Sequence, residues 1–314
     1  MNITKIMIGL GVCVLAALAS AGQTVAANSS GPGDPVIAAA GDISCDPRQS
    51  TTAAQGDDSG PDACHQAATA KLIAAMHPAA VLTLGDEQYP DGALDSFMAG
   101  YDKSWGAFKA ITHPAPGNHE WHTAQAAGYF AYFGPGVGDA SKSYYSFDLG
   151  AWHLISLDGD CKNIGGCGAD SPEGQWLASD LAAHHSACTL AYWHQPRFSS
   201  GPHHSDPTYD ALWRALYAAH ADLVLNGHDH DYERFAPQTP DAKPDPRSGI
   251  TEIVAGTGGR SHYKIGNIEP NSQVSNGTTY GVLFVTLHPH SFDWKFQPEA
   301  GSTFSDSGSQ RCHG

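Results

Sequence analysis

The feature that most constrains the fold is the alternation of short apolar runs with segments of helical periodicity. Short apolar runs that end in polar or glycine-rich clusters indicate buried strands. The predicted strands are 35–40, 81–84, 152–157, 190–193 and 223–225, and the predicted helices are 66–76, 124–133, 173–183 and 209–219. Strands that alternate with helices in this way favour an α/β fold.

The last third of the chain has a different pattern. The runs 250–255, 281–287 and 292–296 are β-rich and have no long helix between them, which predicts antiparallel strands added to the sheet system. No internal repeat or linker divides the chain, and 41% of its 314 residues are hydrophobic, enough for a sizeable core. We therefore predict a single domain over 28–314.

The first 27 residues have the pattern of an export signal. Lys5 supplies a positive end, 6–19 form an apolar run, and small residues at 19–21 or 25–27 offer a cleavage site. The run is too short to span a bilayer comfortably, and an uncleaved anchor is the weaker alternative. We predict a secreted protein, in the extracellular, periplasmic or cell-wall space, with no membrane attachment after cleavage.

The cysteine count agrees with export. Without Cys13, which lies in the signal, six cysteines remain, and an even count in an exported protein favours three disulfides. Proximity in the chain favours Cys45 with Cys64 and Cys161 with Cys167, which leaves Cys188 for Cys312. Other connectivities remain open at this stage.

The net charge of the chain argues against nucleic acid as a binding partner. Asp and Glu number 32 against 16 Lys and Arg, for a net charge of −16. A chain this acidic is a poor partner for a nucleic acid backbone, because such binding depends on clustered Lys and Arg. No feature of the sequence specifies an oligomeric state.

Five polar clusters follow the apolar runs or lie between them. They are Gly-Asp-Ile-Ser at 41–44, Gly-Asp-Glu-Gln-Tyr at 85–89, Gly-Asn-His-Glu at 117–120, Trp-His at 193–194 and Gly-His-Asp-His at 227–230. Strand ends in α/β sheets deliver such side chains into a shared crevice. Each cluster alone is ordinary, but together they supply oxygen and imidazole ligands without a thiolate. That is the ligand set of a two-metal hydrolytic site.

The order of these motifs resembles the calcineurin-like metallophosphoesterases and, within them, the purple acid phosphatases. The resemblance extends over nearly the whole mature chain, from Asp42 through the segment 227–234. It implies an α/β fold in which two mixed β-sheets pack together with helices on both outer faces, a four-layer αββα sandwich.

The resemblance also implies the metal ligands. They are Asp42, Asp86, Tyr89 and His230 for the first metal and Asp86, Asn118, His194 and His228 for the second, so that Asp86 bridges the pair. Many family members have a histidine where this chain has Ser44, and Tyr89 offers a replacement. A phenol with a pKa of about 10 ionises readily only beside a strongly acidic metal. We therefore expect Fe(III) at the Tyr89 site, and Fe(II), Zn or Mn at the second.

The remaining catalytic residues are expected around the phosphate. The resemblance implies that a hydroxide held by the metals attacks phosphorus, with His119 facing the phosphate and Glu120 as its orienting partner. His203 and His204 follow His194 by nine and ten residues, like a histidine pair of the plant purple acid phosphatases. We expect this pair to bind phosphate and protonate the departing alkoxide; a solvated surface loop is the alternative.

The function predicted from the sequence is hydrolysis of small phosphate monoesters by a secreted metallophosphatase. One alternative keeps the two metals but acts on phosphodiesters or nucleotides. A second alternative, which we consider weaker, is a secreted domain that binds phosphate without catalysis. The complete ligand set and His119 favour an enzyme.

Overall fold

The computed structural model describes Met1 and residues 33–45, 64–134, 136–137 and 142–313. The expected signal peptide, apart from Met1, lies outside the described residues. Among the residues that are described, no helix has the length and apolar character that a membrane crossing needs.

The first sheet has six strands in the order β13-β12-β11-β1-β2-β3. Its strands are β1 (Val36–Ala40), β2 (Ala80–Leu84), β3 (Thr112–Ala115), β11 (Gly281–His288), β12 (Ser291–Pro298) and β13 (Ser307–Arg311). The strands β1, β2 and β3 pair in parallel, whereas β11 pairs antiparallel with β1, and β12 and β13 continue the antiparallel half. The sheet is therefore mixed.

The second sheet has seven strands in the order β10-β8-β9-β7-β6-β5-β4. Its strands are β4 (Tyr145–Leu149), β5 (Trp152–Ser156), β6 (Cys188–Tyr192), β7 (Leu223–Asn226), β8 (Tyr232–Phe235), β9 (Thr251–Ala255) and β10 (Ser272–Asn276). The strands β5, β6, β7 and β9 are parallel, and β4, β8 and β10 are antiparallel to their neighbours.

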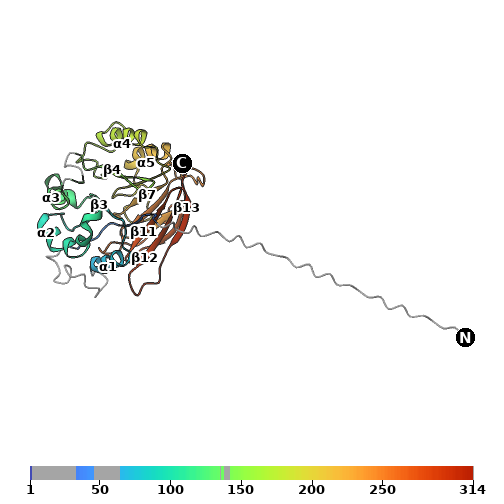
Figure 1. The fold of residues 1–314 in the computed structure, drawn as a ribbon, viewed down its shortest axis with the longest axis horizontal. Helices are drawn as coiled ribbons and strands as arrows, with labels where there is room; N and C mark the ends of the chain where they lie inside the picture. The colour runs from blue at the N-terminus through green and yellow to red at the C-terminus, as the bar shows by residue number, and fades with distance from the viewer. Residues whose placement is uncertain (2–32, 46–63, 135, 138–141, 314) are drawn as a thin grey trace.

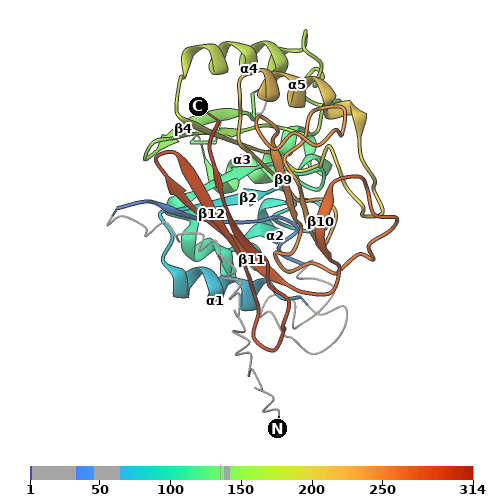
Figure 2. The same ribbon diagram turned by 90° about the vertical axis from the view of Figure 1, so that its right-hand side faces the viewer.

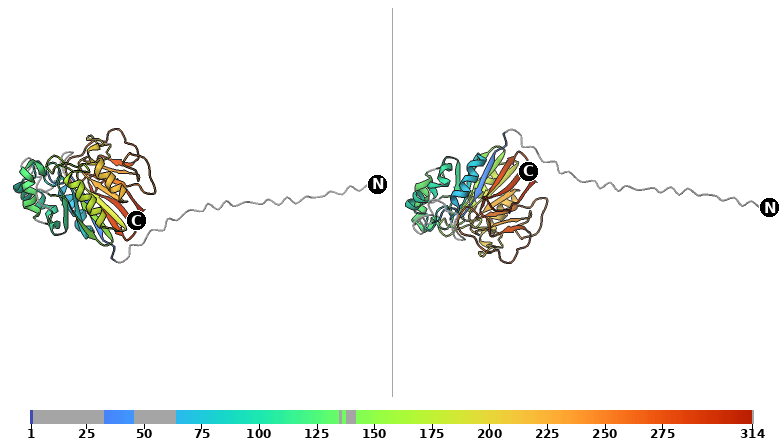
Figure 3. Two further views of the ribbon diagram at one scale, coloured as in Figure 1. Left: turned by 90° about the horizontal axis from the view of Figure 1, so that it is seen from above. Right: turned by 90° about the horizontal axis from the view of Figure 1, so that it is seen from below.

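Helices cover the outer face of each sheet. The α-helices are α1 (Gln66–Met76), α2 (Leu94–Ala99), α3 (Ala127–Phe133), α4 (Pro172–Ala183) and α5 (Asp210–Ala218). Short 3₁₀ helices are Tyr101–Lys103, Trp105–Ile111, Glu120–His122, Ala124–Ala126 and Pro207–Tyr209. Figures 1 and 2 show α4 and α5 at one end of the stack and α1 at the other, with the sheets between them. Figure 3 shows the same layers from above and below.

Strand periodicity explains these four layers. Alternate residues of each central strand face the other sheet; Ile37, Leu82, Leu190 and Leu225 belong to this central core. The residues between them face the helices, so that Val81 packs in a cluster with Ile73 of α1. Because these strands are buried on both faces, they form continuous apolar runs in the sequence. The predicted αββα sandwich is confirmed.

Two sequence predictions need correction. The run 250–255 was expected to add an antiparallel strand, but β9 pairs in parallel with β7, and antiparallel only with β8. The predicted helix 124–133 is a 3₁₀ turn followed by α3, because Gln125 and Ala126 adopt positive φ angles of 57° and 49°. Left-handed residues interrupt the helical hydrogen-bond pattern.

The six cysteines of the described chain form three disulfides. The pairs are Cys45–Cys64, Cys161–Cys167 and Cys188–Cys312, which confirms the pairing favoured by proximity in the chain. The third pair joins the start of β6 to the end of the chain. It therefore fastens the C-terminal strand region to the second sheet.

Candidate metal centre

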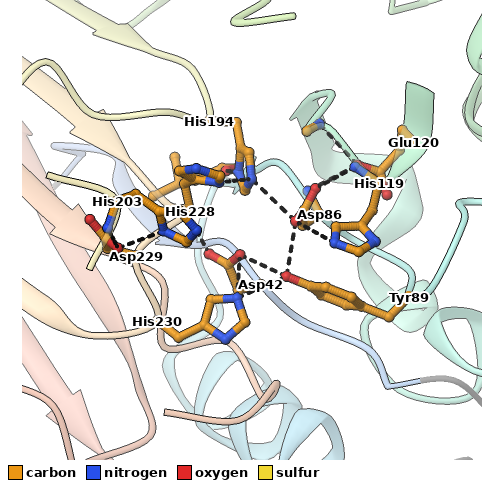
Figure 4. Close-up of polar contacts among 12 residues, drawn as sticks. Asp42, Asp86, Tyr89, His119, Glu120, His194, His203, His228, Asp229 and His230 are labelled. Atoms are coloured by element: carbon orange, nitrogen blue, oxygen red, sulfur yellow. Dashed lines mark hydrogen bonds and ion pairs between the residues drawn. The ribbon is translucent and has the colours of Figure 1, made fainter. Parts of the chain in front are cut away.

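The five polar clusters meet at one edge of the sandwich. Asp42 follows β1, Asp86 follows β2, and His194 and His228 follow β6 and β7 of the other sheet. Strand β3, which the sequence analysis did not predict, ends shortly before Asn118. Parallel strands end at the same side of a sheet, so the two sheets bring these loops together. Figure 4 shows the side chains pointing toward one another.

The backbone of this edge adopts strained conformations. Asp42, Asp86 and His228 have positive φ angles of 58°, 51° and 71°, a region that non-glycine residues seldom occupy. Gly85 also has a positive φ of 80°, and a Cβ there would lie 2.5 Å from Nδ1 of His194. Such strain is typical of functional sites, where the surrounding structure holds the conformation.

Tyr89 is the centre of the cluster. Its hydroxyl lies 2.9 Å from Oδ1 of Asp42, 2.9 Å from Oδ2 of Asp86 and 3.0 Å from Nε2 of His230. All four side chains are at least 95% buried. One hydroxyl proton cannot satisfy three acceptors at once. The arrangement therefore has more electron-pair donors than protons, as a cation site does.

Backbone carbonyls fix the tautomers of two histidines. Nδ1 of His194 lies 2.7 Å from the carbonyl oxygen of Leu84, and Nδ1 of His230 lies 2.6 Å from that of Ser261. Because a carbonyl only accepts, both Nδ1 atoms carry a proton. In the neutral rings Nε2 is then a bare lone pair, and these atoms lie 3.2 Å from Asp86 and Asp42 respectively. Metal-binding histidines have this arrangement.

Asn118 completes the set of expected ligands. Its Oδ1 is buried and has no hydrogen-bond partner among the described residues. An orphaned buried oxygen is costly unless something else binds it. Ligand atoms of Asp42, Asp86 and His194 also lie within 4.8 Å of one another. The residues present therefore fit a metal centre of oxygen and imidazole ligands.

The electrostatics show how strongly these groups are coupled without a cation. Burial opposes ionisation of Asp86, but the neighbouring His194 outweighs it and lowers the pKa of the carboxyl. Burial likewise disfavours charge on His194, yet Asp86 raises the pKa of its imidazole to about 9. Burial and the carboxylates of Asp42 and Asp86 raise the pKa of Tyr89 well above its ordinary value. A tyrosinate therefore needs a strongly acidic cation beside it.

His119 lies beside Asp86 and Tyr89. Its backbone N–H donates to Oδ1 of Asp86 at 2.9 Å, and its Nε2 lies 3.8 Å from Oδ2 of the same residue. Its ring packs at 4.2 Å from that of Tyr89. The orienting partner is not Glu120: Nδ1 donates to the carbonyl oxygen of Pro90 at 2.6 Å.

Glu120 instead ties two ligand loops together. Its buried carboxylate accepts from the backbone N–H of Asp86 at 2.9 Å, Gln88 at 3.1 Å and Gly117 at 2.9 Å. The loops after β2 and β3 are thus held by one side chain. The Gly-Asn-His-Glu motif contains this residue, but its sequence context does not reveal that its partners are backbone amides.

The histidine pair lies beside the second-metal ligands. The His203 ring centroid is 4.0 Å from that of His228. His203 and His204 line a cavity of about 240 Å³ together with Gln195, Pro196, Asp206 and His228. The sequence analysis left a solvated loop as the alternative for this pair. In the structure both residues are exposed, yet both border the cavity beside His228.

Three further residues lie at the site that the sequence analysis did not place there. Tyr263 stacks on His230 with ring centroids 4.0 Å apart, and Asp229 binds His203. The Arg260 guanidinium lies 5.2 Å from the centre of the Tyr89 ring, and this residue was not among the expected site residues. Asp229 stands inside a ligand motif, which is a usable signal, whereas Tyr263 has no motif context.

The geometry defines a class: an α/β protein with a cluster of oxygen and imidazole side chains at the strand ends that fits a metal centre. The calcineurin-like phosphoesterase family model matches residues 36–232, which contain every expected ligand. The chain therefore belongs to the calcineurin-like phosphoesterase family.

Similar proteins point to one branch of that family. The chain is 32% identical to purple acid phosphatase 15 of Arabidopsis thaliana over 174 residues, 49% of this chain and 32% of that protein. It is 30% identical to purple acid phosphatase 22 of the same plant over 145 residues, 43% of this chain and 31% of that protein. The matches thus span about a third of the length of these relatives.

Solved structures agree on the fold. Purple acid phosphatase PPD1 from yellow lupin, Lupinus luteus, superposes with a TM-score of 0.68 at 16% identity, covering 88% of this chain and 53% of that chain. GAP50, the anchor in the inner membrane complex of Plasmodium, gives a TM-score of 0.60 at 16% identity, with 89% of each chain covered. At such identities the likeness shows the fold alone.

Proposed function

We propose that this protein is an exported, binuclear metal-dependent phosphatase that hydrolyses phosphate monoesters. The observation that carries the proposal is the convergence of Asp42, Asp86 and His230 on Tyr89. His194 lies beside Asp86, and backbone carbonyls hold the His194 and His230 imidazoles as lone-pair donors. The similarity to the purple acid phosphatases supports the reaction class.

The proposed ligand sets are those that the resemblance of the motifs implies. Asp42, Asp86, Tyr89 and His230 would hold one cation, and Asp86, Asn118, His194 and His228 the other. When bound, such a pair supplies Lewis-acid activation of water and stabilises charge on the phosphoryl oxygens. Ligation by a Tyr89 tyrosinate would call for Fe(III) at the first position, because only a strongly acidic cation ionises a buried phenol; Fe(II), Zn or Mn is proposed at the second.

The chain's own side chains would surround the phosphate. His119 is fixed through Nδ1 by Pro90, so that Nε2 is the nitrogen on the side of Asp86. It would donate a hydrogen bond to a phosphate oxygen there. His203 and His204, which border the adjoining cavity, would bind phosphate and deliver a proton to the departing alcohol.

Export is part of the proposal. Three disulfides in one domain favour an oxidising compartment. The N-terminal signal predicted from the sequence supports the same location. Signal cleavage can be checked by N-terminal sequencing of protein recovered from the medium or the cell envelope.

Phenol release from phenyl phosphate and from bis-phenyl phosphate tests the reaction, because hydrolysis of either ester frees one phenol. The monoester should be turned over faster; faster turnover of the diester would favour the phosphodiesterase alternative. Binding of inorganic phosphate, with no phenol released from either ester, would favour a non-catalytic role.

The metal assignment has its own test. A visible absorption band that disappears in Tyr89→Phe is the expected signature of a tyrosinate on iron. A protein that is active but colourless would indicate a pair of divalent cations instead of Fe(III).

A further inference from the structure

Asp229 stands between two expected metal ligands, His228 and His230, yet it binds neither. Its carboxylate is fully buried. Oδ1 lies 2.8 Å from Nδ1 of His203 and accepts the His203 backbone N–H at 3.2 Å. Figure 4 shows the carboxylate beside the His203 ring. One side chain therefore fixes both the backbone and the ring of His203.

The loop that carries His203 is built around this carboxylate. The Ser199 hydroxyl donates to Oδ2 of Asp229 and accepts the N–H of Gly201 at 2.9 Å. A Cβ at Gly201 would lie 2.3 Å from the Asp229 carboxyl carbon, so the loop comes this close only with glycine there. The contact between loop and carboxylate is thus a specific feature of this chain's packing.

The other ring nitrogen of His203 is left for a ligand. With Nδ1 engaged by Asp229, Nε2 makes no hydrogen bond to any described residue. The ring lies against His228, with centroids 4.0 Å apart, and borders the cavity of about 240 Å³. This cavity is the space beside the proposed metal centre into which the alcohol part of a phosphate ester can extend.

We propose that Asp229 is the positioning residue of the leaving-group acid, and that it acts by holding His203 with Nε2–H toward the ester oxygen. This inference rests on the proposed phosphatase function. In the step concerned, the bond between phosphorus and the alcohol oxygen breaks, and its electron pair goes to that oxygen. The Nε2 proton transfers to the same oxygen. The alcohol leaves neutral, water has supplied the new oxygen on phosphorus, and His203 regains a proton from solvent.

The proposal predicts a dependence on the leaving group. Alkoxides are poor leaving groups and need a proton, whereas 4-nitrophenolate leaves without one. In Asp229→Asn the negative charge beside Nδ1 is lost, so the imidazolium that carries protons on both Nδ1 and Nε2 and donates from Nε2 is no longer stabilised. We expect kcat for glycerol phosphate to fall about 10-fold or more, with little change in KM, and kcat for 4-nitrophenyl phosphate to fall less than about 3-fold.

The matched control is Asp231→Asn. Asp231 is equally buried and lies in the same loop, but its carboxylate has no hydrogen-bond partner among the described residues. This variant should keep the wild-type ratio between the two substrates. Metal content is measured on every variant, to show whether the substitution has disturbed the neighbouring proposed ligands His228 and His230.

A double-mutant cycle separates positioning from packing. In a His203→Gln background, Asp229→Asn should cause no further loss on glycerol phosphate. An equal loss on both substrates, or an additive loss in the double variant, would overturn the proposal. Wild-type protein that releases no phosphate from either ester would instead defeat the proposed function itself.

Discussion

Two clusters in this protein are built from the same residue types, yet their chemistry differs. One is the candidate metal centre described above, called the metal centre below. The other, here called the His153 cluster, consists of Asp148, His153, Asp180 and His184 on β4, β5 and α4. Ligand atoms of His153, Asp180 and His184 also lie within 4.8 Å of one another. Proximity alone therefore does not distinguish the two clusters.

The His153 cluster is an ion-pair network. Nδ1 of His153 lies 2.8 Å from Oδ1 of Asp148, and Nε2 lies 2.8 Å from Oδ2 of Asp180. Burial opposes charge on this ring, but the two carboxylates outweigh it and raise the pKa of His153. Two carboxylate acceptors call for a proton on each nitrogen. The ring is then an imidazolium with no lone pair for a metal.

In the metal centre the outer nitrogen meets a different partner. His194 and His230 donate Nδ1–H to backbone carbonyls, which carry no full charge. Without a cation, and despite burial, Asp86 raises the pKa of the His194 imidazole to about 9, but a cation that takes the place of the Nε2 proton leaves a neutral ring with its Nε2 lone pair on the metal. The comparison teaches that the partner of the outer nitrogen decides whether an Asp and His cluster binds a cation or becomes an ion pair.

The largest expected effect is in the metal centre. Asp86→Asn removes the carboxylate proposed to be shared by both cations, and phosphate release from phenyl phosphate should fall by more than about 10³-fold. Metal content measured on the same protein should fall with it. Wild-type turnover in this variant would contradict the assignment.

A smaller effect is expected one step away from the ligands. The Glu120 carboxylate now accepts hydrogen bonds from three backbone N–H groups. In Glu120→Gln the side-chain NH₂ would face one of these donors, and that hydrogen bond would be lost. The loops after β2 and β3 should loosen, weakening metal affinity by about 10–100-fold. Competition with a chelator measures this. An unchanged affinity would show that the tether does not shape the centre.

In the His153 cluster we expect an effect on stability and none on metal content. His153→Gln should lower the free energy of unfolding by about 2 kcal/mol at pH 6. The raised pKa of His153 means that its contribution is full below the unfolded-state pKa of about 6.5 and fades as pH rises through the folded value.

The pH series gives the decisive comparison for that variant. The difference from wild type in thermal unfolding should shrink between pH 6 and pH 9. A constant difference would mean that packing, rather than the charge of the ring, explains the loss.

The smallest effect is expected at the edge of the same cluster. The Asp148 side chain is 63% exposed, so solvent screens its pairing with His153. Asp148→Asn should cost about 0.5 kcal/mol and leave metal content unchanged. A loss as large as that of His153→Gln would show that the exposed carboxylate dominates the network.

Much of this molecule could be predicted from the sequence. The apolar runs of β1, β2 and β6 are buried on both faces and stand out in the chain, and polar residues at their ends indicate the site. Strand β8 is buried but short and contains Glu233 and Arg234, and β10 is polar and only partly buried, so neither carries such a pattern. The orientation of β9 depends on which strands lie beside it, which is a tertiary property.

The details that make the site work were beyond sequence reasoning. The positive φ angles of Asp42 and Asp86 and the carbonyl partners of His194 and His230 arise from the packing of distant loops. Asp229 lies within the motif at 227–230, but its contact with His203 depends on the path of the loop at 199–204. Candidate ligands could be named from the motifs, whereas tautomers and positioning contacts required the structure.

The most direct test of the two-metal account is anomalous X-ray diffraction from crystals of the metal-loaded protein. The account predicts two peaks roughly 3.5–4 Å apart, with Asp86 between them, and no peak at His153. A peak in the His153 cluster, or none beside Asp86, would contradict it.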